Sequence, residues 1–305
     1  MNSVVVAKFG GSVIGVDGIS IPVIIQRINS LSKDAKVVAV FSAPLTVVEG
    51  KRRSLTDVAL ELGKRAEDGK AFDLIILRKT YEKILELVSS EFQEKCRTVI
   101  DGCLDMVRIE LEKAMEKKEF ADEVRSKTLA YSGEILMSNV MEYILQSQGI
   151  KSKVVGLDNW PIITDSNIES TNFLASESNK KVEFLERLLD ENQVITIGGF
   201  IGRTADGVIT TYERGGSDRT AADLGILLHK KFDVKINLEK DSSVVSADPR
   251  IVKDGLTEVH SISYNEARLA GMFGMNILDP IAIKEILENG ASLPIVITDM
   301  KNTEK

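Results

Sequence analysis

Residues 214–222 read Arg-Gly-Gly-Ser-Asp-Arg-Thr-Ala-Ala, which places flexible backbone, a hydroxyl and a carboxylate where a helix is predicted to begin. Ser217 or Asp218 is suited to cap this helix, because Ser and Asp side chains accept hydrogen bonds from the first helical N–H groups. The start of a helix also favours anions. Arg214 and two glycines exceed what capping requires, so this stretch predicts an anion-binding site rather than an ordinary turn.

A second glycine-containing stretch, Lys-Phe-Gly-Gly-Ser at residues 8–12, follows the first predicted strand. Gly10 and Gly11 allow backbone N–H groups to approach phosphate oxygens, and Lys8 supplies a compact positive charge. The alternative interpretation is a simple turn with Lys8 in solvent. The sequence contains neither G-x-x-x-x-G-K nor G-x-G-x-x-G, which argues against a P-loop and a dinucleotide-binding fingerprint. The two stretches together predict a phosphoryl-transfer site assembled from opposite ends of the sequence.

The hydrophobic pattern alternates between short apolar runs and amphipathic stretches. Six runs predict strands, at residues 4–7, 36–41, 153–157, 194–197, 234–238 and 293–298. Nine stretches have helical spacing, at residues 21–31, 54–65, 72–88, 104–117, 121–148, 181–190, 218–229, 264–271 and 281–288. Strands that alternate with helices predict an α/β fold around a mainly parallel sheet with helices on both faces. The chain lacks a linker-like segment, so we expect a single domain over residues 1–305 with two lobes that divide near residue 193.

Charge and cysteine usage exclude several classes of protein. The 305 residues include 39 Lys and Arg against 46 Asp and Glu, a net charge of −7, so a general attraction to nucleic acid or to anionic membranes is not expected. The chain shows neither a secretory signal nor a stretch of transmembrane length, and we expect a cytoplasmic protein. Cys96 and Cys103 lie seven apart, which predicts two reduced thiols, and the isolated His229 and His260 predict no zinc site.

Ser132, Gly133 and Glu134 fall inside a long helical pattern, where a glycine costs about 1 kcal/mol relative to alanine. Close approach of a ligand or of another backbone would compensate for this cost, with Glu134 then presented to a cation such as an ammonium group. Ordinary helix packing with a solvated Glu134 is the alternative.

Seven segments, in this order, resemble the amino-acid kinase superfamily, and most closely the aspartokinases. They are residues 8–12, 42–44 with 55–57, 132–134, 198–202, 214–218, 247–252 and 262–267. The resemblance implies an αβα sandwich in which residues 1–192 hold the phosphoryl acceptor and residues 193–305 hold MgATP. It also implies direct, in-line transfer, which depends on positioning and charge neutralisation.

The resemblance assigns roles to individual residues of this chain. Lys8 would stabilise the transferring phosphoryl group, and Asp218 would orient Lys8 and help to organise the metal ion that accompanies ATP. The other implied nucleotide contacts are Gly10, Gly11, Ser12, Asp241, Asp248 and Arg250. If the acceptor is aspartate, Arg214 would bind its α-carboxylate and Glu134 its ammonium group. The remaining implied acceptor contacts are Ser42, Ala43, Thr56 and Ser217.

The chain also departs from the aspartokinase pattern. Aspartokinases usually carry T-D-V-D-G-V-Y before A-D-P-R, whereas residues 240–246 read Lys-Asp-Ser-Ser-Val-Val-Ser. Residues 277–280 read Ile-Leu-Asp-Pro where relatives have a V-L-H-P-like segment, and Tyr212 and Glu213 are unusual before the Arg-Gly-Gly sequence. The sequence ends seven residues after the last predicted strand, without the ACT domains of typical aspartokinases, so we expect no control through such domains.

Three functions fit these observations. The first is ATP-dependent phosphorylation of the aspartate side-chain carboxylate, and the second is phosphorylation of a hydroxyl of another small acidic metabolite, such as a mevalonate-type acid or phosphorylated acid. An amino acid or a nucleoside monophosphate is a further possible acceptor. The third function is that of a non-catalytic nucleotide or metabolite sensor. The resemblance also implies a homodimer.

Overall fold

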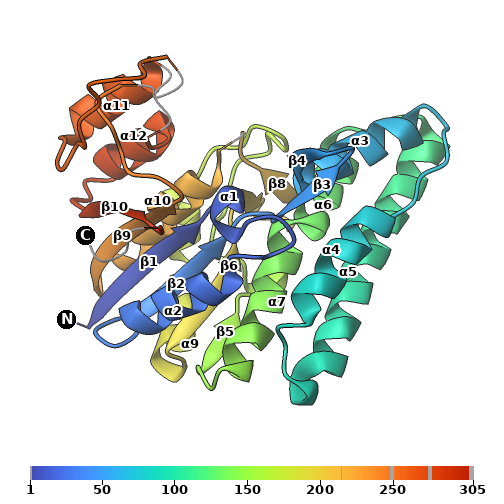
Figure 1. Ribbon diagram of the computed structural model, residues 1–305, viewed down its shortest axis with the longest axis horizontal. Helices are drawn as coiled ribbons and strands as arrows, with labels where there is room; N and C mark the ends of the chain where they lie inside the picture. Colours follow the sequence, from blue (N-terminus) through green and yellow to red (C-terminus); the bar gives the residue numbers. More distant parts are fainter. Residues whose placement is uncertain (1, 214, 248–250, 274–276, 302–305) are drawn as a thin grey trace.

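A six-stranded parallel sheet forms the centre of the protein (Figure 1), in a computed structural model that describes residues 2–213, 215–247, 251–273 and 277–301. The strand order is β10-β9-β1-β2-β6-β5, and every neighbouring pair in this sheet is parallel. The strands are β1 (Ser3–Phe9), β2 (Lys36–Phe41), β5 (Ser152–Val154), β6 (Val194–Gly198), β9 (Asp233–Lys240) and β10 (Ile295–Asp299). All six were predicted from the sequence, and the predicted parallel α/β architecture is confirmed.

Strand β1 occupies an inner position, where it pairs with β2 on one side and with β9 on the other. Lys8 is paired in register with Val40 of β2 and with Leu238 of β9. Because the strands are parallel, the carboxyl ends of β1, β2 and β9 meet at one edge of the sheet, where α/β proteins bind ligands.

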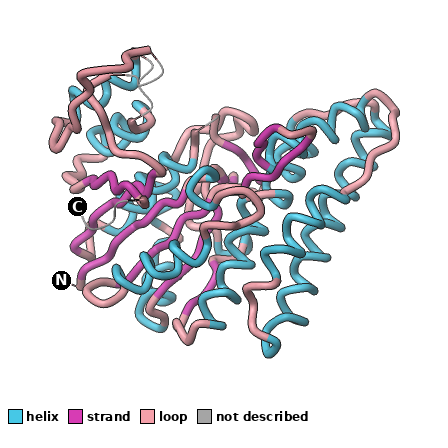
Figure 2. The backbone as a smooth tube through the Cα atoms, in the orientation of Figure 1, coloured by secondary structure: helices cyan, strands magenta, loops and turns pink. Residues whose placement is uncertain are grey.

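Helices cover both faces of the sheet (Figure 2), and each face has its own hydrophobic core. Alternate residues of β1 divide between the two cores: Val5 and Phe9 pack with α2 (Ile21–Leu31) and α7 (Glu134–Ser147), whereas Val4 and Val6 pack with α9 (Val182–Glu191) and α10 (Ser217–Leu228). This is the predicted αβα arrangement. Near-continuous apolar strands are expected when both faces of a sheet are buried.

Further helices extend the fold on either side of the sheet. On the side of α7 lie α3 (Leu55–Glu67), α4 (Ile75–Leu85), α5 (Ser90–Lys117) and α6 (Asp122–Ser132). At the opposite end, α11 (Tyr264–Met272) packs on α12 (Pro280–Glu288), which packs on α10. The short helices are α1 (Gly11–Ile14), η1 (Leu157–Asn159) and α8 (Ala175–Asn179). Within the described part of the chain, no helix is both long and apolar enough to cross a membrane.

Two antiparallel hairpins were not predicted from the hydrophobic pattern. They are formed by β3 (Leu45–Val48) with β4 (Lys51–Ser54), and by β7 (Ile201–Arg203) with β8 (Ile209–Thr211). Strands of three or four residues are too short to establish a period in the sequence, since strands are usually recognised from longer alternation. Helix α5 also begins at Ser90, well before the predicted start at residue 104.

The predicted helix over residues 121–148 is divided at Gly133, which has φ −126° and ψ −93° and separates α6 from α7. A Cβ atom on Gly133 would lie 2.7 Å from the Ala43 Cβ and 3.3 Å from the Thr56 hydroxyl oxygen. The close approach of another part of the chain therefore accounts for this glycine. This was one of the two alternatives inferred from the sequence.

Two helical glycines give a matched test of how the helices beside α7 pack. In Gly63→Ala, the new Cβ would lie 2.1 Å from ring atoms of the buried Phe120. We expect a loss of about 1–3 kcal/mol in the free energy of unfolding, as for other overpacked cores. In Gly102→Ala no heavy atom lies within 4 Å of the new Cβ, and we expect a gain of about 1 kcal/mol from helix propensity. Urea unfolding of both variants measures the two values, and a stabilised Gly63→Ala would contradict the packing against Phe120.

Candidate active site

An ion pair connects the two glycine-containing stretches that the sequence singled out. Lys8 lies near the carboxyl end of β1, Asp218 lies in the first turn of α10, and the Lys8 Nζ is 2.8 Å from the Asp218 Oδ1. Lys240, the last residue of β9, places its Nζ 3.5 Å from the other carboxylate oxygen of Asp218. Two ammonium groups thus share one carboxylate, which leaves positive charge available for an anionic ligand.

The Asp218 carboxylate is buried, and burial by itself raises the pKa of a carboxyl group. The charges of Lys8 and Lys240 more than offset this effect and hold the pKa of Asp218 below its ordinary value. Burial lowers the pKa of Lys240, although Asp218 acts in the opposite direction. Asp218 is therefore ionised at neutral pH and holds both lysine side chains at the edge of the sheet.

The glycines after β1 bring backbone close to this ion pair. A Cβ atom on Gly10 would lie 3.3 Å from the Lys8 Nζ, and one on Gly11 would lie 2.6 Å from the carbonyl oxygen of Ala43. Gly11 and Ser12 are the first two residues of the short helix α1, so their N–H groups have no acceptor within that helix. Two lysines and unpaired backbone N–H groups suit the oxygens of a phosphate chain, and the residues present therefore fit the implied nucleotide phosphates.

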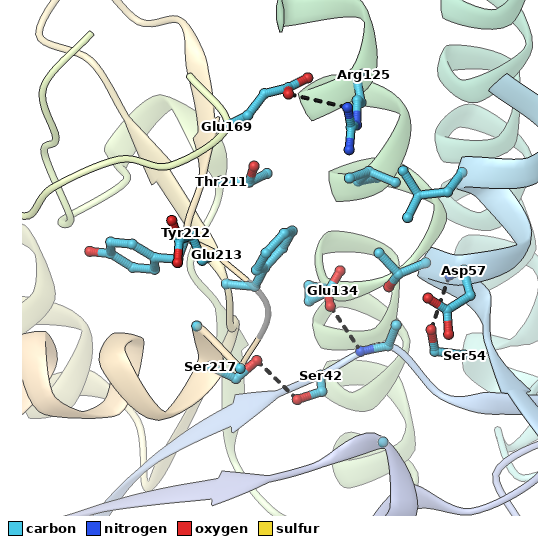
Figure 3. A pocket seen from close by; sticks show the side chains of 18 of the residues that line it. Ser42, Ser54, Asp57, Arg125, Glu134, Glu169, Thr211, Tyr212, Glu213 and Ser217 are labelled. Atoms are coloured by element: carbon cyan, nitrogen blue, oxygen red, sulfur yellow. Dashed lines mark hydrogen bonds and ion pairs between the residues drawn. The ribbon is translucent and has the colours of Figure 1, made fainter. Parts of the chain in front are cut away.

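A cavity of about 570 Å³ opens beside the ion pair (Figure 3). Its lining includes Lys8, and the Ser42 hydroxyl donates a hydrogen bond of 3.0 Å to the Ser217 hydroxyl across one end. Seven of the residues predicted to bind nucleotide or acceptor line this cavity: Lys8, Gly11, Ser42, Ala43, Thr56, Glu134 and Ser217.

Glu134 contributes a buried carboxylate to the cavity. Its Oε1 accepts a hydrogen bond of 3.3 Å from the Ala43 N–H, whereas its Oε2 is buried and makes no hydrogen bond to any described residue. Burial raises the pKa of Glu134 to about 7, against the opposing effect of nearby backbone N–H groups. A buried carboxylate oxygen without a donor is suited to receive one from a ligand, and a ligand ammonium group is the charged donor that would restore its ionised form.

The chain around Glu134 is shaped for this close packing. A Cβ atom on Gly198, at the end of β6, would lie 2.9 Å from the backbone carbonyl of Glu134. The Tyr81 hydroxyl lies 3.0 Å from the carbonyl oxygen of Gly133 and 3.2 Å from that of Ser132. These contacts fix the break between α6 and α7, which directs Glu134 into the cavity (Figure 3).

The remaining predicted residues lie in different places. Ser12 is exposed at the start of α1, and Asp241 is half-buried directly after Lys240. Arg214, Asp248 and Arg250 lie outside the described residues. Among the residues that the structure describes, no group of three or more His, Cys, Asp or Glu side chains is arranged to hold a metal ion.

One lining residue of the cavity that was not predicted from the sequence is Glu169, in the loop over residues 164–173. Glu169 of this loop accepts a hydrogen bond of 3.1 Å from the Asp122 N–H at the start of α6 and pairs with Arg125 at 3.2 Å (Figure 3). Ser170 donates a hydrogen bond of 2.7 Å to Glu213, one of the unusual residues before the Arg-Gly-Gly sequence. The concentration of Asp and Asn at 165–172 was the available signal, because such residues bond their own loop backbone.

Lys240 was also missed as a partner of Asp218. It lies two residues beyond the end of the predicted strand 234–238, so the sequence analysis placed it in a loop. A basic residue at the end of a strand that neighbours β1 was the signal that could have identified it.

Residues 3–299 match the Amino acid kinase family. The chain belongs to this family. Members of the family are phosphotransferases, and the superfamily expected from the seven sequence segments is therefore confirmed.

The relatives from this family include aspartokinases. The chain is 28% identical over 310 residues to a bifunctional aspartokinase/homoserine dehydrogenase 2 of Arabidopsis thaliana, covering 97% of this chain and 31% of the plant protein. It is 29% identical over 174 residues to the aspartokinase of Rickettsia felis, covering 57% of this chain and 41% of that protein. The chain thus spans less than half the length of these relatives.

Solved structures show the same fold. Aspartokinase III of Escherichia coli, in complex with aspartate and ADP, superposes with a TM-score of 0.80 at 21% identity, over 98% of this chain and 62% of that one. The aspartate kinase of Clostridium acetobutylicum gives a TM-score of 0.68 at 22% identity, over 97% and 60% of the two chains. At these identities the likeness establishes the fold of the chain.

The raised pKa of Glu134 predicts a pH dependence of stability. Between the ordinary value of 4.5 and about 7, the folded protein holds a proton that the unfolded chain has lost, so the free energy of unfolding falls as pH rises. The full effect is about 3 kcal/mol, at about 1.4 kcal/mol for each pKa unit. Glu134→Gln is expected to remove this fall, as measured by urea unfolding at pH 5 and pH 7.5.

The matched control is Glu142→Gln on the same helix, where a buried carboxylate pairs with Lys153 at 3.0 Å. This variant retains Glu134 and should keep the wild-type difference between the two pH values. Equal pH dependence in wild type and Glu134→Gln would show that Glu134 is ionised in the folded protein at pH 5.

Proposed function

We propose that this protein transfers the γ-phosphoryl group of ATP to the side-chain carboxylate of aspartate. The observation that carries the proposal is the Lys8–Asp218 ion pair at one end of a cavity that also receives the buried carboxylate of Glu134. The aspartokinase relatives support the choice of aspartate, as does the aspartate and ADP bound in the E. coli aspartokinase III structure.

In the proposed reaction, one implied lobe would bind mainly the nucleotide and the other mainly the acceptor. Residues 193–305 would contribute Asp218, Lys240 and Asp241 to the nucleotide end, and Lys8 would face the same end from β1. MgATP would supply the phosphoryl group and a divalent cation that neutralises charge on the phosphates. Lys8 would stabilise the negative charge on the phosphoryl oxygens during transfer, while Asp218 keeps the Lys8 ammonium in place.

Residues 1–192 would provide most of the acceptor contacts. Glu134 would receive the ammonium group of aspartate through its unpartnered Oε2. Ser42, Ala43, Thr56 and Ser217 would line the remainder, and Arg214 would bind the α-carboxylate as the family resemblance implies. The side-chain carboxylate of aspartate is already ionised at neutral pH, so its oxygen can attack the γ-phosphorus without a base.

The chemistry of the product gives the decisive experiment. The acceptor oxygen forms a bond to the γ-phosphorus as the bond to the bridging oxygen of ADP breaks, which yields an acyl phosphate. Acyl phosphates react with hydroxylamine to form hydroxamates, whereas phosphate esters do not. We expect ADP release and hydroxamate in equal amounts when the protein, MgATP, aspartate and hydroxylamine are combined.

Turnover with hydroxy acids and none with aspartate would instead support the second function, phosphorylation of a hydroxyl on another acidic metabolite. Binding of MgATP without ADP release for any acceptor tested would support the sensor function.

Lys8→Met tests the catalytic role of the lysine. Loss of one charged donor at a developing negative charge lowers kcat by about 100- to 1000-fold in other enzymes, and we expect the same range here with ATP binding retained. Lys36→Met is the matched control, because the Lys36 Nζ donates to the Asn192 carbonyl at the amino end of β2 and should leave kcat unchanged. Both are measured by ADP release, and a wild-type kcat in Lys8→Met would remove the proposed role.

The state of Glu134 predicts how aspartate recognition depends on pH. Only the ionised carboxylate attracts an ammonium group, so with a pKa of about 7 we expect kcat/KM for aspartate to rise about tenfold from pH 6 to pH 8. Glu134→Gln should give a low value without this rise. Initial rates at saturating ATP measure the profile, and a rise that persists in Glu134→Gln would assign it to another group.

A further inference from the structure

Tyr212 lies directly behind the turn that carries Ser217 and Asp218. Tyr212 and the neighbouring Glu213 both belong to the cavity lining, but the Tyr212 side chain is buried, with 1% exposure, and Figure 3 shows its ring directed away from the cavity. A Cβ atom on Gly216 would lie 2.3 Å from the Tyr212 Cβ. The backbone at residue 216 therefore packs so close to Tyr212 that only glycine fits there.

Two buried polar side chains, Asp223 and Arg219, contact Tyr212, and the partly buried Glu285 pairs with Arg219. The Tyr212 hydroxyl donates a hydrogen bond to the Asp223 carboxyl on α10. The Arg219 guanidinium stacks over the ring, with its Cζ 4.1 Å from the ring centre, and its Nη2 lies 2.7 Å from the Glu285 Oε1 on α12. We refer to Tyr212, Arg219, Asp223 and Glu285 as the Tyr212 network.

The charges of the Tyr212 network balance if Asp223 keeps its proton. Burial and the adjacent Glu285 raise the pKa of Asp223 well above its ordinary value, and burial also raises the pKa of Glu285. With Asp223 neutral, one guanidinium faces one carboxylate, as expected for a buried group of this kind. Asp279 also affects Glu285 from the start of α12.

The described residues of the turn, 213 and 215–218, bond to their own backbone and to Thr220, whose N–H donates to the Gly216 carbonyl at 2.9 Å. The Gly216 N–H donates to the Glu213 carbonyl at 2.9 Å, and the Asp218 N–H donates to the Gly215 carbonyl at 3.1 Å. Gly215 has a φ of +96°, which leaves this backbone with the freedom of glycine. The turn lines the cavity through Gly215, Gly216 and Ser217 and ends at Asp218. The position of the turn therefore affects the cavity through Ser217 and the ion pair with Lys8 through Asp218.

We propose that the Tyr212 network positions the turn over residues 215–218, so that Tyr212, Arg219, Asp223 and Glu285 are positioning residues for the acceptor pocket. The network connects the turn to α10 and α12. Of the residues in these two helices, only Ser217 belongs to the proposed acceptor pocket. The network would therefore set the affinity for the acceptor through the turn, with the Tyr212 ring directed away from the cavity. The kinetic part of this proposal rests on the proposed function, whereas its structural part does not.

Tyr212→Phe tests the proposal, because it removes the hydroxyl and keeps the ring that supports Gly216. Loss of one buried hydrogen bond corresponds to about a five- to tenfold effect. We expect backbone amide exchange at Gly216 and Asp218 to accelerate by that factor, with KM for aspartate raised similarly and KM for ATP unchanged. Hydrogen exchange followed by mass spectrometry, together with ADP-release kinetics, measures these values.

Asp223→Asn is the conservative variant. A neutral amide can accept from the Tyr212 hydroxyl as a protonated carboxyl group does, and it adds no charge beside Glu285, so exchange and KM should remain within about twofold of wild type. Tyr264→Phe is the control for loss of a hydroxyl elsewhere, since Tyr264 donates to the Leu293 carbonyl outside the network, and it should leave both amides unchanged.

Unchanged exchange at Gly216 and Asp218 in Tyr212→Phe would overturn the proposal. So would equal acceleration in Tyr264→Phe, or equal increases in KM for aspartate and for ATP, since both would indicate general loss of stability. If wild type phosphorylates no aspartate, the proposed function fails, and the exchange results alone then decide the role of the Tyr212 network.

Discussion

The ion pair between Lys8 and Asp218 is the constraint on which the candidate site depends. It joins the end of an inner strand to the start of a helix from the opposite half of the sequence, at 2.8 Å and with the Asp218 carboxylate buried. A buried carboxylate with one cation would be neutralised, but Asp218 has two, Lys8 and Lys240. The excess positive charge, held on the rigid ends of β1 and β9, is what a phosphate group would meet.

Glu134, the second carboxylate of the site, has surroundings that act in the opposite direction. Asp218 is ionised because cations surround it, whereas burial raises the pKa of Glu134 to about 7 and leaves one of its oxygens without a hydrogen bond. One carboxylate organises the protein's own lysines, and the other is available to a ligand. Two acids in one cavity can thus have different tasks because their surroundings differ.

Much of the fold was predictable because the central strands β1, β2 and β6 are continuous apolar runs of five to seven residues that are largely buried. The six strands of the sheet and a joint site for the segments of Lys8 and Asp218 could be inferred from local pattern, whereas for Gly133 the sequence left close approach and ordinary helix packing open. The hairpins β3–β4 and β7–β8 could not, because each strand is too short for a period. Lys240, the loop over residues 164–173 and the contacts of Tyr212 depend on which distant segments meet. Glu285 lies far from Arg219 in the sequence, and only the packing of α12 on α10 brings them together.

The strand order has a consequence for how the two implied lobes can exist. Strand β1 pairs with β9, β2 pairs with β6, and β5 pairs with β6 alone, so three of the five pairings in the sheet cross residue 193. A fragment of residues 1–192 would keep β1 and β2 with unpaired edges on both sides, and β5 would have no neighbour. Such edges favour aggregation. The pairings across residue 193 therefore make the sheet depend on both parts of the chain, and we expect neither part to fold as an independent domain.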